Sequence, residues 1–337
     1  MGIKGLTQLI KEHSPDAIQT KNLHNLAGKR VAVDASLFMY KMLINMRGTN
    51  NAYLTSKTGK VVSHITGIFY KTVNYLSVNI TPIYVFDGKP PDSKHDVLKQ
   101  RNNKVSNAKL ALENNELTEE TKNNLEKQTI RLTKEHVDDI KQLLELMGVS
   151  YVQANGEAEA YASEMCRKGM VDYVVTEDMD TLAFGCPRMI RTCLDKSMKR
   201  KDLISIIDLE CILTNFNMTY TQFIDMCILC GCDYCTNIPG IGNKGAFNLI
   251  KKHTSIEGIL INLKANLVKN IPENYDIKYK ESRRLFTMFQ EKLDLEQLSI
   301  HHSSQNIEKL YIYLTQSCSM SEQRVHNSIK KMKQVYK

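Results

Sequence analysis

Residues 150–180 read SYVQANGEAEAYASEMCRKGMVDYVVTEDMD, and this stretch decides the fold class. Its short runs at residues 150–153 and 173–176, rich in Val and Tyr, are typical of buried strands, and the segment between them has a helical pattern. A strand, a helix and a second strand in this order predict a βαβ unit, which belongs to a parallel sheet.

Two similar strand-like runs lie nearer the N-terminus, at residues 30–33 and 83–86. Helical patterns follow at residues 63–76 and 138–147, and Gly148 is placed to cap the second of these helices. Strands that alternate with helices of this length predict an α/β fold whose parallel sheet is covered by helices on both faces.

The rest of the chain is expected to be helical. Residues 89–135 form a polar insertion with sparse apolar positions, which we interpret as helices standing clear of the core. From about Leu203 onward the pattern is helical again, with helices expected near residues 221–229 and 246–252 around a Gly-rich turn at 239–242. This half is expected to pack on the α/β core.

The composition is that of a soluble globular protein with a basic surplus. The 337 residues carry a formal charge of +8, with 24% charged and 42% hydrophobic residues, and fit one large domain or two smaller ones. No apolar run is long enough for a membrane span, and no signal peptide opens the chain. Nine cysteines without a secretory signal predict reduced thiols, so we expect an intracellular protein.

Acidic residues follow all four predicted strands. In open parallel sheets the functional site forms at the carboxyl ends of the strands, so these acids are expected to converge. Any one of them is more readily explained as a turn former or helix cap, but their recurrence after every strand favours a site. They are Asp34, Asp87, Glu157 and Glu159, and the run Glu177, Asp178 and Asp180.

Clustered carboxylates raise one another's pKa, so the site needs protons or cations. Hard divalent cations such as Mg²⁺ suit an all-oxygen ligand set, and the lack of His and Cys at these positions argues against zinc. The number of acids is sufficient for two ions, as in the displacement of a phosphoryl group. Glu157 and Glu159 do not share a helix face, so an irregular segment or a bridging water is required there.

Two basic segments match a phosphate-containing ligand. Residues 89–111 hold six Lys and Arg against two Asp, which is either a solvated helix face or a surface that holds a phosphodiester beside the carboxylates. Gly240 and Gly242 lie in the Gly-rich turn, where backbone amides can approach phosphates, and Lys244 just after it adds charge. A plain corner between two helices has the same signature.

Seven blocks of sequence together resemble a known family. In order and with similar spacing, the chain resembles the flap endonucleases of the XPG-like 5′-nuclease superfamily over nearly its whole length. The blocks are Met-Gly-Ile-Lys-Gly-Leu at 1–6, Val-Asp-Ala-Ser at 33–36, Tyr-Val-Phe-Asp-Gly-Lys-Pro-Pro at 84–91, Glu-Ala-Glu-Ala at 157–160, Thr-Glu-Asp-Met-Asp at 176–180, Gly-Cys-Asp-Tyr-Cys at 231–235 and Ile-Pro-Gly-Ile-Gly at 238–242.

The resemblance implies a PIN-like α/β core with a mostly parallel central sheet flanked by helices, a helical arch and a helix-two-turn-helix element. It divides the chain into an N-terminal nuclease region at 1–110, an internal nuclease region at 136–260 and a C-terminal helical region at 261–337. The arch is placed at about 89–135, and the helix-two-turn-helix at about 221–252.

The resemblance also implies structure-specific cleavage of 5′ DNA flaps, with 5′→3′ exonuclease activity, by two Mg²⁺ ions in replication and repair. Lys94 and Arg101 then contact the scissile phosphate, and Tyr40 and Arg47 bind DNA, Tyr40 by stacking on a base. The turn with Gly240, Gly242 and Lys244 grips duplex DNA, with K⁺ as its ion. The implied metal ligands are Asp34, Asp87, Glu157, Glu159, Asp178, Asp180 and Asp233, of which Asp233 follows no predicted strand.

The sequence departs from the family pattern at three places, of which the first, Gly156 where a serine is usual, removes no ligand. Cys227, Cys230, Cys232 and Cys235 have a metal-like spacing, which we interpret as buried hydrophobic packing. The C-terminal tail with a clamp-binding motif, common in cellular members, is missing, so the sequence does not support recruitment by a sliding clamp. We expect a monomer with a nuclear location by analogy, or another compartment if the protein is viral.

Two alternatives remain open at this point. One is a 5′→3′ exonuclease of the same superfamily, or a relative that prefers bubbles or RNA. The other is a non-catalytic DNA-binding scaffold that keeps the fold. The intact set of acids argues against a scaffold, because a decayed site has no reason to retain a cluster of like charges.

Overall fold

The computed structural model describes residues 2–47, 52–114, 117–194, 202–265, 271–292 and 300–333. Its contacts divide the chain into two compact units. The first unit comprises residues 1–25, 88–97 and 155–297, and the second comprises residues 26–87, 98–154 and 298–337. Each unit is described separately below.

The second unit contains three parallel strands at the positions that the sequence predicts. They are β2 (Arg30–Asp34), β3 (Thr81–Phe86) and β4 (Tyr151–Gln153). Asp34 pairs in register with Val85, and Phe86 pairs with Gln153. Because parallel strands place their carboxyl ends at one edge, Asp34 and Asp87 belong to the same edge of these strands.

Helices of the second unit bury apolar residues against these strands and against one another. The expected helices are present as α3 and α6, and Gly148 caps α6 with a left-handed φ of 69°. Near the C-terminus, α15 contacts α3 and α14 contacts α6. The helices are α2 (Ala35–Asn45), α3 (Ser63–Ser77), α6 (Lys134–Met147), α14 (Ile307–Ile312) and α15 (Glu322–Lys333), with a π-helical turn at Tyr313–Ser317.

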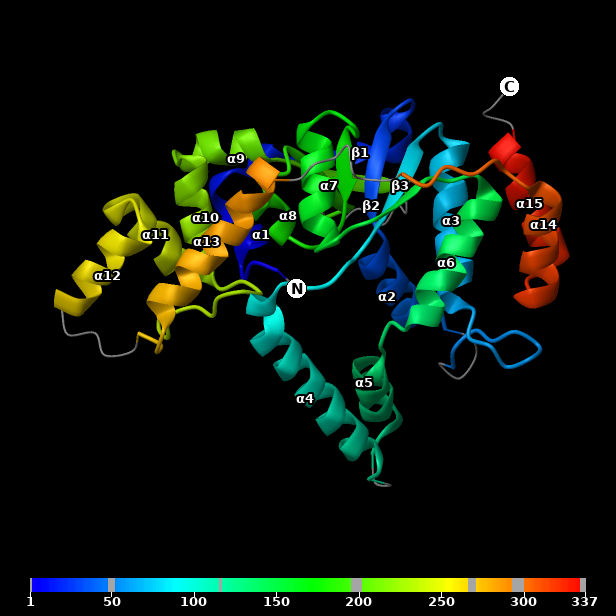
Figure 1. Cartoon of the computed structure of the whole chain (residues 1–337), viewed down its shortest axis with the longest axis horizontal. Coiled ribbons are helices and arrows are strands. Elements are labelled where there is room, and N and C mark those ends of the chain that lie inside the picture. The colour runs from blue at the N-terminus through cyan, green and yellow to red at the C-terminus, as the bar shows by residue number, and fades with distance from the viewer. Residues whose placement is uncertain are drawn as a thin grey trace. The chain divides into compact units, whose positions relative to one another are not determined.

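The polar insertion forms helices, as expected from its composition. A short 3-10 turn (Asp92–Lys94) precedes α4 (His95–Leu112), and α5 (Glu119–Thr129) follows. None of the residues of α5 is buried, and Ala108 is the buried hydrophobic residue of α4. Figure 1 shows α5 standing away from β2 and β3 of the same unit, as the predicted helical arch requires.

In its described residues the first unit has four strands, of which the sequence predicted one, β5 (Tyr173–Val175). Parallel to it lies β6 (Arg188–Thr192), and β7 (Leu203–Asp208) is antiparallel to both β6 and β1 (Ile18–Asn22). The expectation that the chain is purely helical from Leu203 onward is therefore wrong for residues 203–208. The branched side chains in Leu-Ile-Ser-Ile-Ile-Asp favour a strand, and this strand is paired on both sides.

Eight helices complete the described part of the first unit. The expected helix, turn and helix of the C-terminal half are α10 and α11, joined by the Gly-rich turn. The helices are α1 (Leu6–His13), α7 (Ala158–Arg167), α8 (Asp180–Ala183), α9 (Leu209–Phe216), α10 (Tyr220–Cys230), α11 (Asn243–His253), α12 (Ile256–Ala265) and α13 (Tyr275–Lys292).

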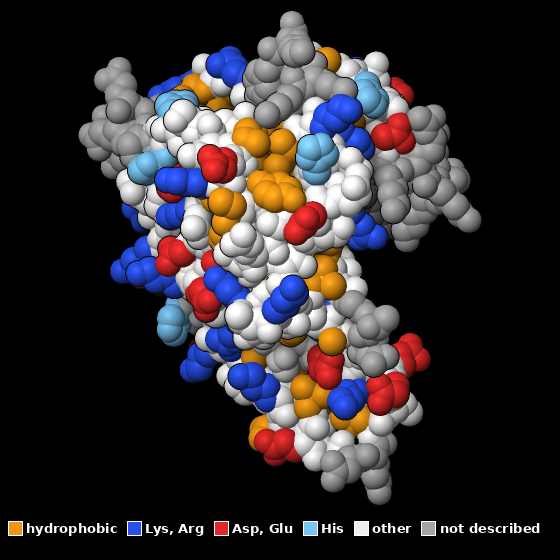
Figure 2. Space-filling model, turned by 90° about the vertical axis from the view of Figure 1, so that its right-hand side faces the viewer, with side chains coloured by type: hydrophobic (Ala, Val, Ile, Leu, Met, Phe, Trp, Pro, Cys, Tyr) orange, Lys and Arg blue, Asp and Glu red, His pale blue; other side chains and the backbone are white. Residues whose placement is uncertain are grey.

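The predicted α/β class with a mostly parallel sheet is confirmed. Among the described residues, the strand pairs within the two units comprise three parallel and two antiparallel pairs. The three-region division at residues 110, 136 and 261 remains a prediction. On the face drawn in Figure 2, Lys and Arg side chains are interspersed with Asp and Glu, so the basic surplus does not form a single field there.

Candidate functional site

Five of the predicted ligands lie in the first unit, at the ends of its elements. Glu157 is the N-cap of α7 and has an extended backbone, while Glu159 lies in the first helical turn. Because the helix begins between these two acids, the structure supplies the irregular segment that their spacing requires. Asp178 lies between β5 and α8, Asp180 is the first residue of α8, and Asp233 follows α10.

Four of these carboxylates are buried. The exposed fractions are 6% for Glu157, 7% for Asp178, 4% for Asp180 and 9% for Asp233. Burial raises the pKa of Asp180 well above its usual range, and the charges of Asp178 and Asp233 raise it further. Burial likewise raises the pKa of Asp178, with a contribution from Asp233. Mutual repulsion of this kind shows that these carboxylates share one environment that favours cations.

Lys94 supplies a cation to this cluster. Its ammonium contacts Glu157 Oε1 and lies 3.4 Å from Asp233 Oδ2, and its side chain is 15% exposed. Burial lowers the pKa of Lys94, but the attraction of Glu157, Glu159 and Asp233 outweighs burial and raises the pKa overall. The short turn that carries Lys94 is attached beside α7, because Gly88 N–H donates to the Gly156 carbonyl at 2.7 Å.

The donor set fits a hard divalent cation in its chemistry. All donors are carboxylate oxygens, and the buried Asp180 Oδ1 has no hydrogen-bond partner in the described structure. Within the described residues, no group of three or more His, Cys, Asp and Glu side chains forms a ready ligand cage as it stands. The ammonium of Lys94 contacts two of the carboxylates, those of Glu157 and Asp233.

Gly2, which the sequence analysis did not assign to the site, packs directly against residues 177–180, here called the acidic turn. Its backbone is left-handed, with φ of 82°. A Cβ at this position would collide with Asp178 Oδ1 and would lie 3.0 Å from Asp180 Oδ1. The N-terminal sequence Met-Gly-Ile-Lys-Gly-Leu was the available signal, because a glycine at this place allows the close approach.

Asp34 and Asp87 lie in the second unit, at the edge where β2 and β3 end. Asp34 is 2% exposed and is the N-cap of α2, where its Oδ1 accepts from Leu37 N–H at 2.9 Å. Asp87 is exposed, and its backbone carbonyl accepts from Gln153 Nε2 at 2.6 Å. The structure thus assigns Asp34 the capping role that the simpler interpretation expected.

The predicted phosphate and DNA contacts of the second unit lie on three segments. Tyr40 is half-buried on α2, and Arg101 is half-buried on α4. Arg47 follows α2, donates to the Ile44 carbonyl at 3.3 Å and stacks its guanidinium 4.1 Å from the Tyr53 ring centre.

The Gly-rich turn of the first unit has the backbone geometry that its glycines predict. Gly240 is left-handed, with φ of 84°, and Gly242 caps α11 in an extended conformation. Both glycines are exposed, with open space where a Cβ would lie. Lys244, in the first turn of α11, is exposed and pairs with Glu12 of α1 at 3.1 Å. The turn and one cation at the start of α11 are therefore exposed.

The four closely spaced cysteines are buried in and after α10. Burial raises the pKa of Cys230 to about 12 and that of Cys235 to about 11. Burial also raises the pKa of Cys227 and Cys232 well above their usual value. These thiols stay protonated near neutral pH, which agrees with their interpretation as hydrophobic packing.

Glu177 does not join the buried carboxylates, although it stands in the same acidic run. Its side chain pairs with Arg191 of β6 at 3.2 Å.

In the described part of the chain, no helix has the length and apolarity of a membrane span.

Comparisons with known proteins agree with this geometry. The XPG N-terminal domain family matches residues 1–108, and the XPG I-region family matches residues 148–233. Flap endonuclease 1-A of Sorghum bicolor is 40% identical over 337 residues, which cover 99% of this chain and 87% of that protein.

Solved structures show the same fold. Flap endonuclease-1 from Methanococcus jannaschii superposes with a TM-score of 0.68 at 28% identity, covering 95% of this chain and 97% of that one. The catalytic core of Rad2 in complex with DNA substrate gives a TM-score of 0.72 at 19% identity, covering 98% and 100%, a likeness of fold alone. From the family matches and the 40% identity over nearly its whole length, the chain belongs to the flap endonuclease 1 family of XPG-like, PIN-fold nucleases.

Proposed function

We propose that this protein is a structure-specific 5′ flap endonuclease, with 5′→3′ exonuclease activity, that hydrolyses phosphodiesters of branched DNA in replication and repair. The observation that carries the proposal is the buried carboxylate cluster of Glu157, Asp178, Asp180 and Asp233 with Lys94 among them. Family membership supplies the substrate class, and the cluster supplies the means of hydrolysis.

Divalent metal is the cofactor that this cluster is suited to hold. In the first unit the ligands would be Glu157, Glu159, Asp178, Asp180 and Asp233, and the family positions in the second unit are Asp34 and Asp87. Two Mg²⁺ ions, when bound, would supply Lewis-acid stabilisation of the phosphate and a more acidic water. No side-chain nucleophile is needed for this chemistry.

Lys94 has two successive roles in this proposal. Without metal, its ammonium neutralises Glu157 and Asp233. With divalent ions bound to those carboxylates, the Lys94 ammonium would contact the scissile phosphate of the substrate. Its pKa is raised, so it remains charged throughout and stabilises the negative charge that develops on the phosphate oxygens. Arg101 of α4 would add a second cation by family analogy.

DNA binding is proposed to use separate elements. The exposed start of α11, with Gly240, Gly242 and Lys244, suits the backbone of the duplex and a K⁺ ion held between turn and phosphate. Tyr40 would stack on an unpaired base and Arg47 would contact the strand near it.

The cellular setting is likewise proposed from family membership. We expect a monomer that acts on branched DNA, located in the nucleus or in whichever compartment replicates its DNA. Recruitment by a sliding clamp is not part of the proposal.

A cleavage assay on a double-flap substrate tests the proposed function. The wild-type protein should cut the 5′ flap near its junction in Mg²⁺ and should not cut in EDTA. Asp180→Ala should abolish cleavage and retain flap binding, because it removes a buried ligand and no predicted DNA contact. Asp16→Ala, at an exposed acid outside the cluster, is the control and should cut normally.

The same substrates separate the alternatives. On labelled flap, nick and gap duplexes, the proposed enzyme would release the flap in one piece, whereas a 5′→3′ exonuclease would release only single nucleotides from the 5′ end of every substrate. Cleavage by Asp180→Ala at the wild-type rate would refute the proposed site. Absence of Mg²⁺-dependent cleavage of all branched substrates would leave a DNA-binding scaffold as the function.

A further inference from the structure

Arg191 of β6 contacts two residues of the acidic turn, Glu177 and Met179. Its guanidinium Nε donates to Glu177 Oε2 at 3.2 Å, and its Nη1 lies 3.2 Å from the Met179 sulfur and 3.0 Å from the Thr7 hydroxyl of α1. Glu177 immediately precedes Asp178, and Met179 stands between Asp178 and Asp180. One side chain therefore contacts the residues on both sides of Asp178.

Glu177 is bound to β6 through both carboxylate oxygens. While Oε2 accepts from Arg191, Oε1 accepts from the Thr192 backbone N–H at 3.1 Å and from the Thr192 hydroxyl. The side chains of Glu177 and Arg191 are 19% and 16% exposed, so most of this ion pair is shielded from solvent. An Arg–carboxylate pair in such surroundings has a more defined geometry than a pair in open water.

These contacts begin at the residue that follows the last backbone hydrogen bond between β5 and β6. Val175 pairs with Ile190, and Thr176 N–H donates to the Ile190 carbonyl at 3.2 Å. After Thr176, the acidic turn has left the β5–β6 ladder. The contacts of Glu177 with Arg191 and Thr192 extend the attachment to β6 by side chains, just where the two carboxylates must be aimed.

We infer that the ion pair of Arg191 and Glu177 is a positioning device for the carboxylates of Asp178 and Asp180. This inference rests on the proposed metal-binding role of those two acids. The guanidinium contacts described above go to Glu177, Met179 and Thr7, and not to Asp178 or Asp180. Arg191 therefore acts by holding the backbone of residues 177–179. Groups that orient metal ligands in this way commonly alter metal affinity or activity about 10- to 100-fold when removed.

The decisive measurement is metal binding without DNA. Arg191→Met keeps the apolar stem and removes every donor of the guanidinium. Titration of Mn²⁺, with free Mn²⁺ followed by electron paramagnetic resonance, should show an affinity at least about tenfold weaker than that of the wild type. Arg191→Lys, which restores the charge and one donor, should recover part of the affinity. Arg188→Met is the matched control, because Arg188 lies on the same strand with its guanidinium over the Tyr173 ring and should leave Mn²⁺ affinity unchanged.

Cleavage kinetics give a second readout that simple loss of stability does not produce. Arg191→Met should lower kcat and raise the Mg²⁺ concentration for half-maximal rate, with the KM for flap DNA unchanged. High Mg²⁺ should restore part of the rate. Wild-type Mn²⁺ affinity and wild-type Mg²⁺ dependence in Arg191→Met would overturn the inference, even if the variant melts at a lower temperature.

Two further comparisons keep the test decisive. If Arg191→Met does not fold, Glu177→Gln is tested in its place. The glutamine side-chain oxygen can still accept from Thr192, but the charge that pairs with Arg191 is lost. Wild-type Mn²⁺ affinity in Glu177→Gln would also overturn the inference. Failure of the proposed function looks different. A wild-type protein that binds Mn²⁺ in an Arg191-dependent manner and cuts no branched DNA would contradict flap cleavage and support the positioning role.

Discussion

Lys94 shows at the scale of one residue how the protein handles a cluster of like charges. Four buried carboxylates in one unit would repel one another strongly if all were ionised without a cation nearby. The ammonium beside Glu157 and Asp233 reduces this repulsion. In the proposed function, the same ammonium would contact a phosphate once divalent metal neutralised the carboxylates.

Replacing Lys94 should separate catalysis from binding. In Lys94→Met, the single-turnover rate on a double flap in Mg²⁺ should fall about 10²- to 10³-fold, because a charge that stabilises the transition state is lost. The dissociation constant for the same DNA, measured in Ca²⁺, should change far less.

Lys122→Met provides the comparison for the Lys94 variant, since Lys122 is an exposed cation on α5 with no place in the cluster. Its rate and affinity should match those of the wild type. Equal losses of rate and affinity in Lys94→Met would reduce Lys94 to a simple phosphate anchor.

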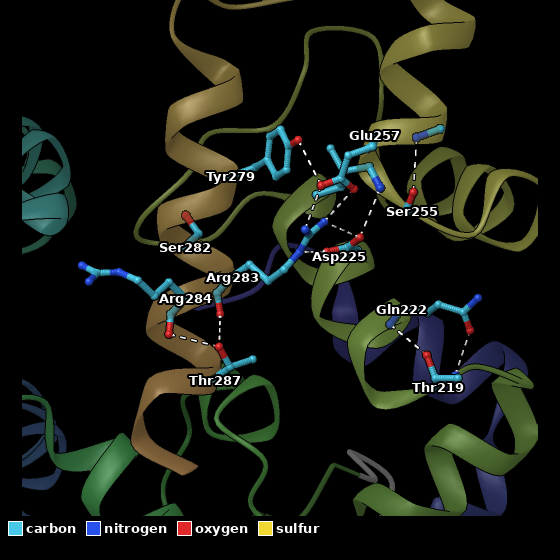
Figure 3. Close-up of polar contacts among 12 residues, drawn as sticks. Thr219, Gln222, Asp225, Ser255, Glu257, Tyr279, Ser282, Arg283, Arg284 and Thr287 are labelled. Atoms are coloured by element: carbon cyan, nitrogen blue, oxygen red, sulfur yellow. Dashed lines mark hydrogen bonds and ion pairs between the residues drawn. The ribbon is translucent and has the colours of Figure 1, made fainter. Parts of the chain in front are cut away.

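At the scale of secondary-structure elements, one arginine joins three helices of the first unit. Figure 3 shows Arg283 of α13 directed at Asp225 of α10 and at Glu257 of α12. Its Nε and Nη2 donate to Asp225 at 2.7 and 2.8 Å, and its Nη1 and Nη2 donate to Glu257 at 2.8 and 3.0 Å. The chain leaves α10 toward Asp233, so this clamp secures the helix that precedes a predicted ligand.

Breaking the clamp should destabilise the protein. Arg283→Met leaves Asp225, which is 1% exposed, without its counter-charge, and removal of one partner of a buried pair costs about 3 kcal/mol or more. Urea unfolding at pH 7 measures the change in the free energy of unfolding. Arg284→Met is the control, because Arg284 is exposed and points away from Asp225 in Figure 3. Equal stability of the two variants would contradict the clamp.

The clamp also predicts a dependence on acid through Glu257. Hydrogen bonds from Arg283 lower the pKa of Glu257 to about 2 from an ordinary 4.5. Because the folded pKa is the lower one, the ionised carboxylate stabilises the fold above pH 4.5, and this contribution is lost as the pH falls toward 2. The stability difference between wild type and Glu257→Gln should therefore shrink over that range. Burial raises the pKa of Asp225 instead, so Asp225 contributes with the opposite sign.

For the whole molecule, charge governs the encounter with DNA. The formal sum of +8 includes the predicted metal-binding acids, which divalent ions would neutralise in the working enzyme. Contacts between Lys or Arg and phosphates release counterions, so binding of branched DNA should weaken steeply with salt. The sequence-independent part of the affinity resides in those contacts.

Lys244 should contribute one unit to this salt dependence. In Lys244→Ala, the slope of log affinity against log KCl concentration, measured by anisotropy with labelled flap DNA in Ca²⁺, should fall by about 1. Single-turnover cleavage at saturating enzyme should change little, because we propose Lys244 as a contact to the duplex and it lies outside the carboxylate cluster. Lys309→Ala, at an exposed cation of α14, is the control; an identical slope for the two variants would exclude Lys244 from the DNA contact.

Local sequence patterns predicted much of the fold. They missed strands that form because a neighbouring strand pairs with them. The four runs rich in Val, Ile, Tyr and Phe are strands, and the periodic segments at 63–76 and 138–147 are helices, because each pattern buries its own apolar side chains. In contrast, β1 has an exposed centre, Gln19 to Lys21, and is a strand because it pairs with β7. No local periodicity reveals such a strand.

The sequence by itself determined the α/β class, the candidate acids and the family, because each depends on residue types at short spacing. The tertiary structure alone decided the position of Lys94 between Glu157 and Asp233, the approach of Gly2 to Asp178 and Asp180, and the attachment of Glu177 to β6. These contacts join residues distant in the chain or turn neighbouring acids in different directions. The contacts and the directions of the acids depend on how the backbone folds back on itself, which the spacing of residues along the chain does not specify.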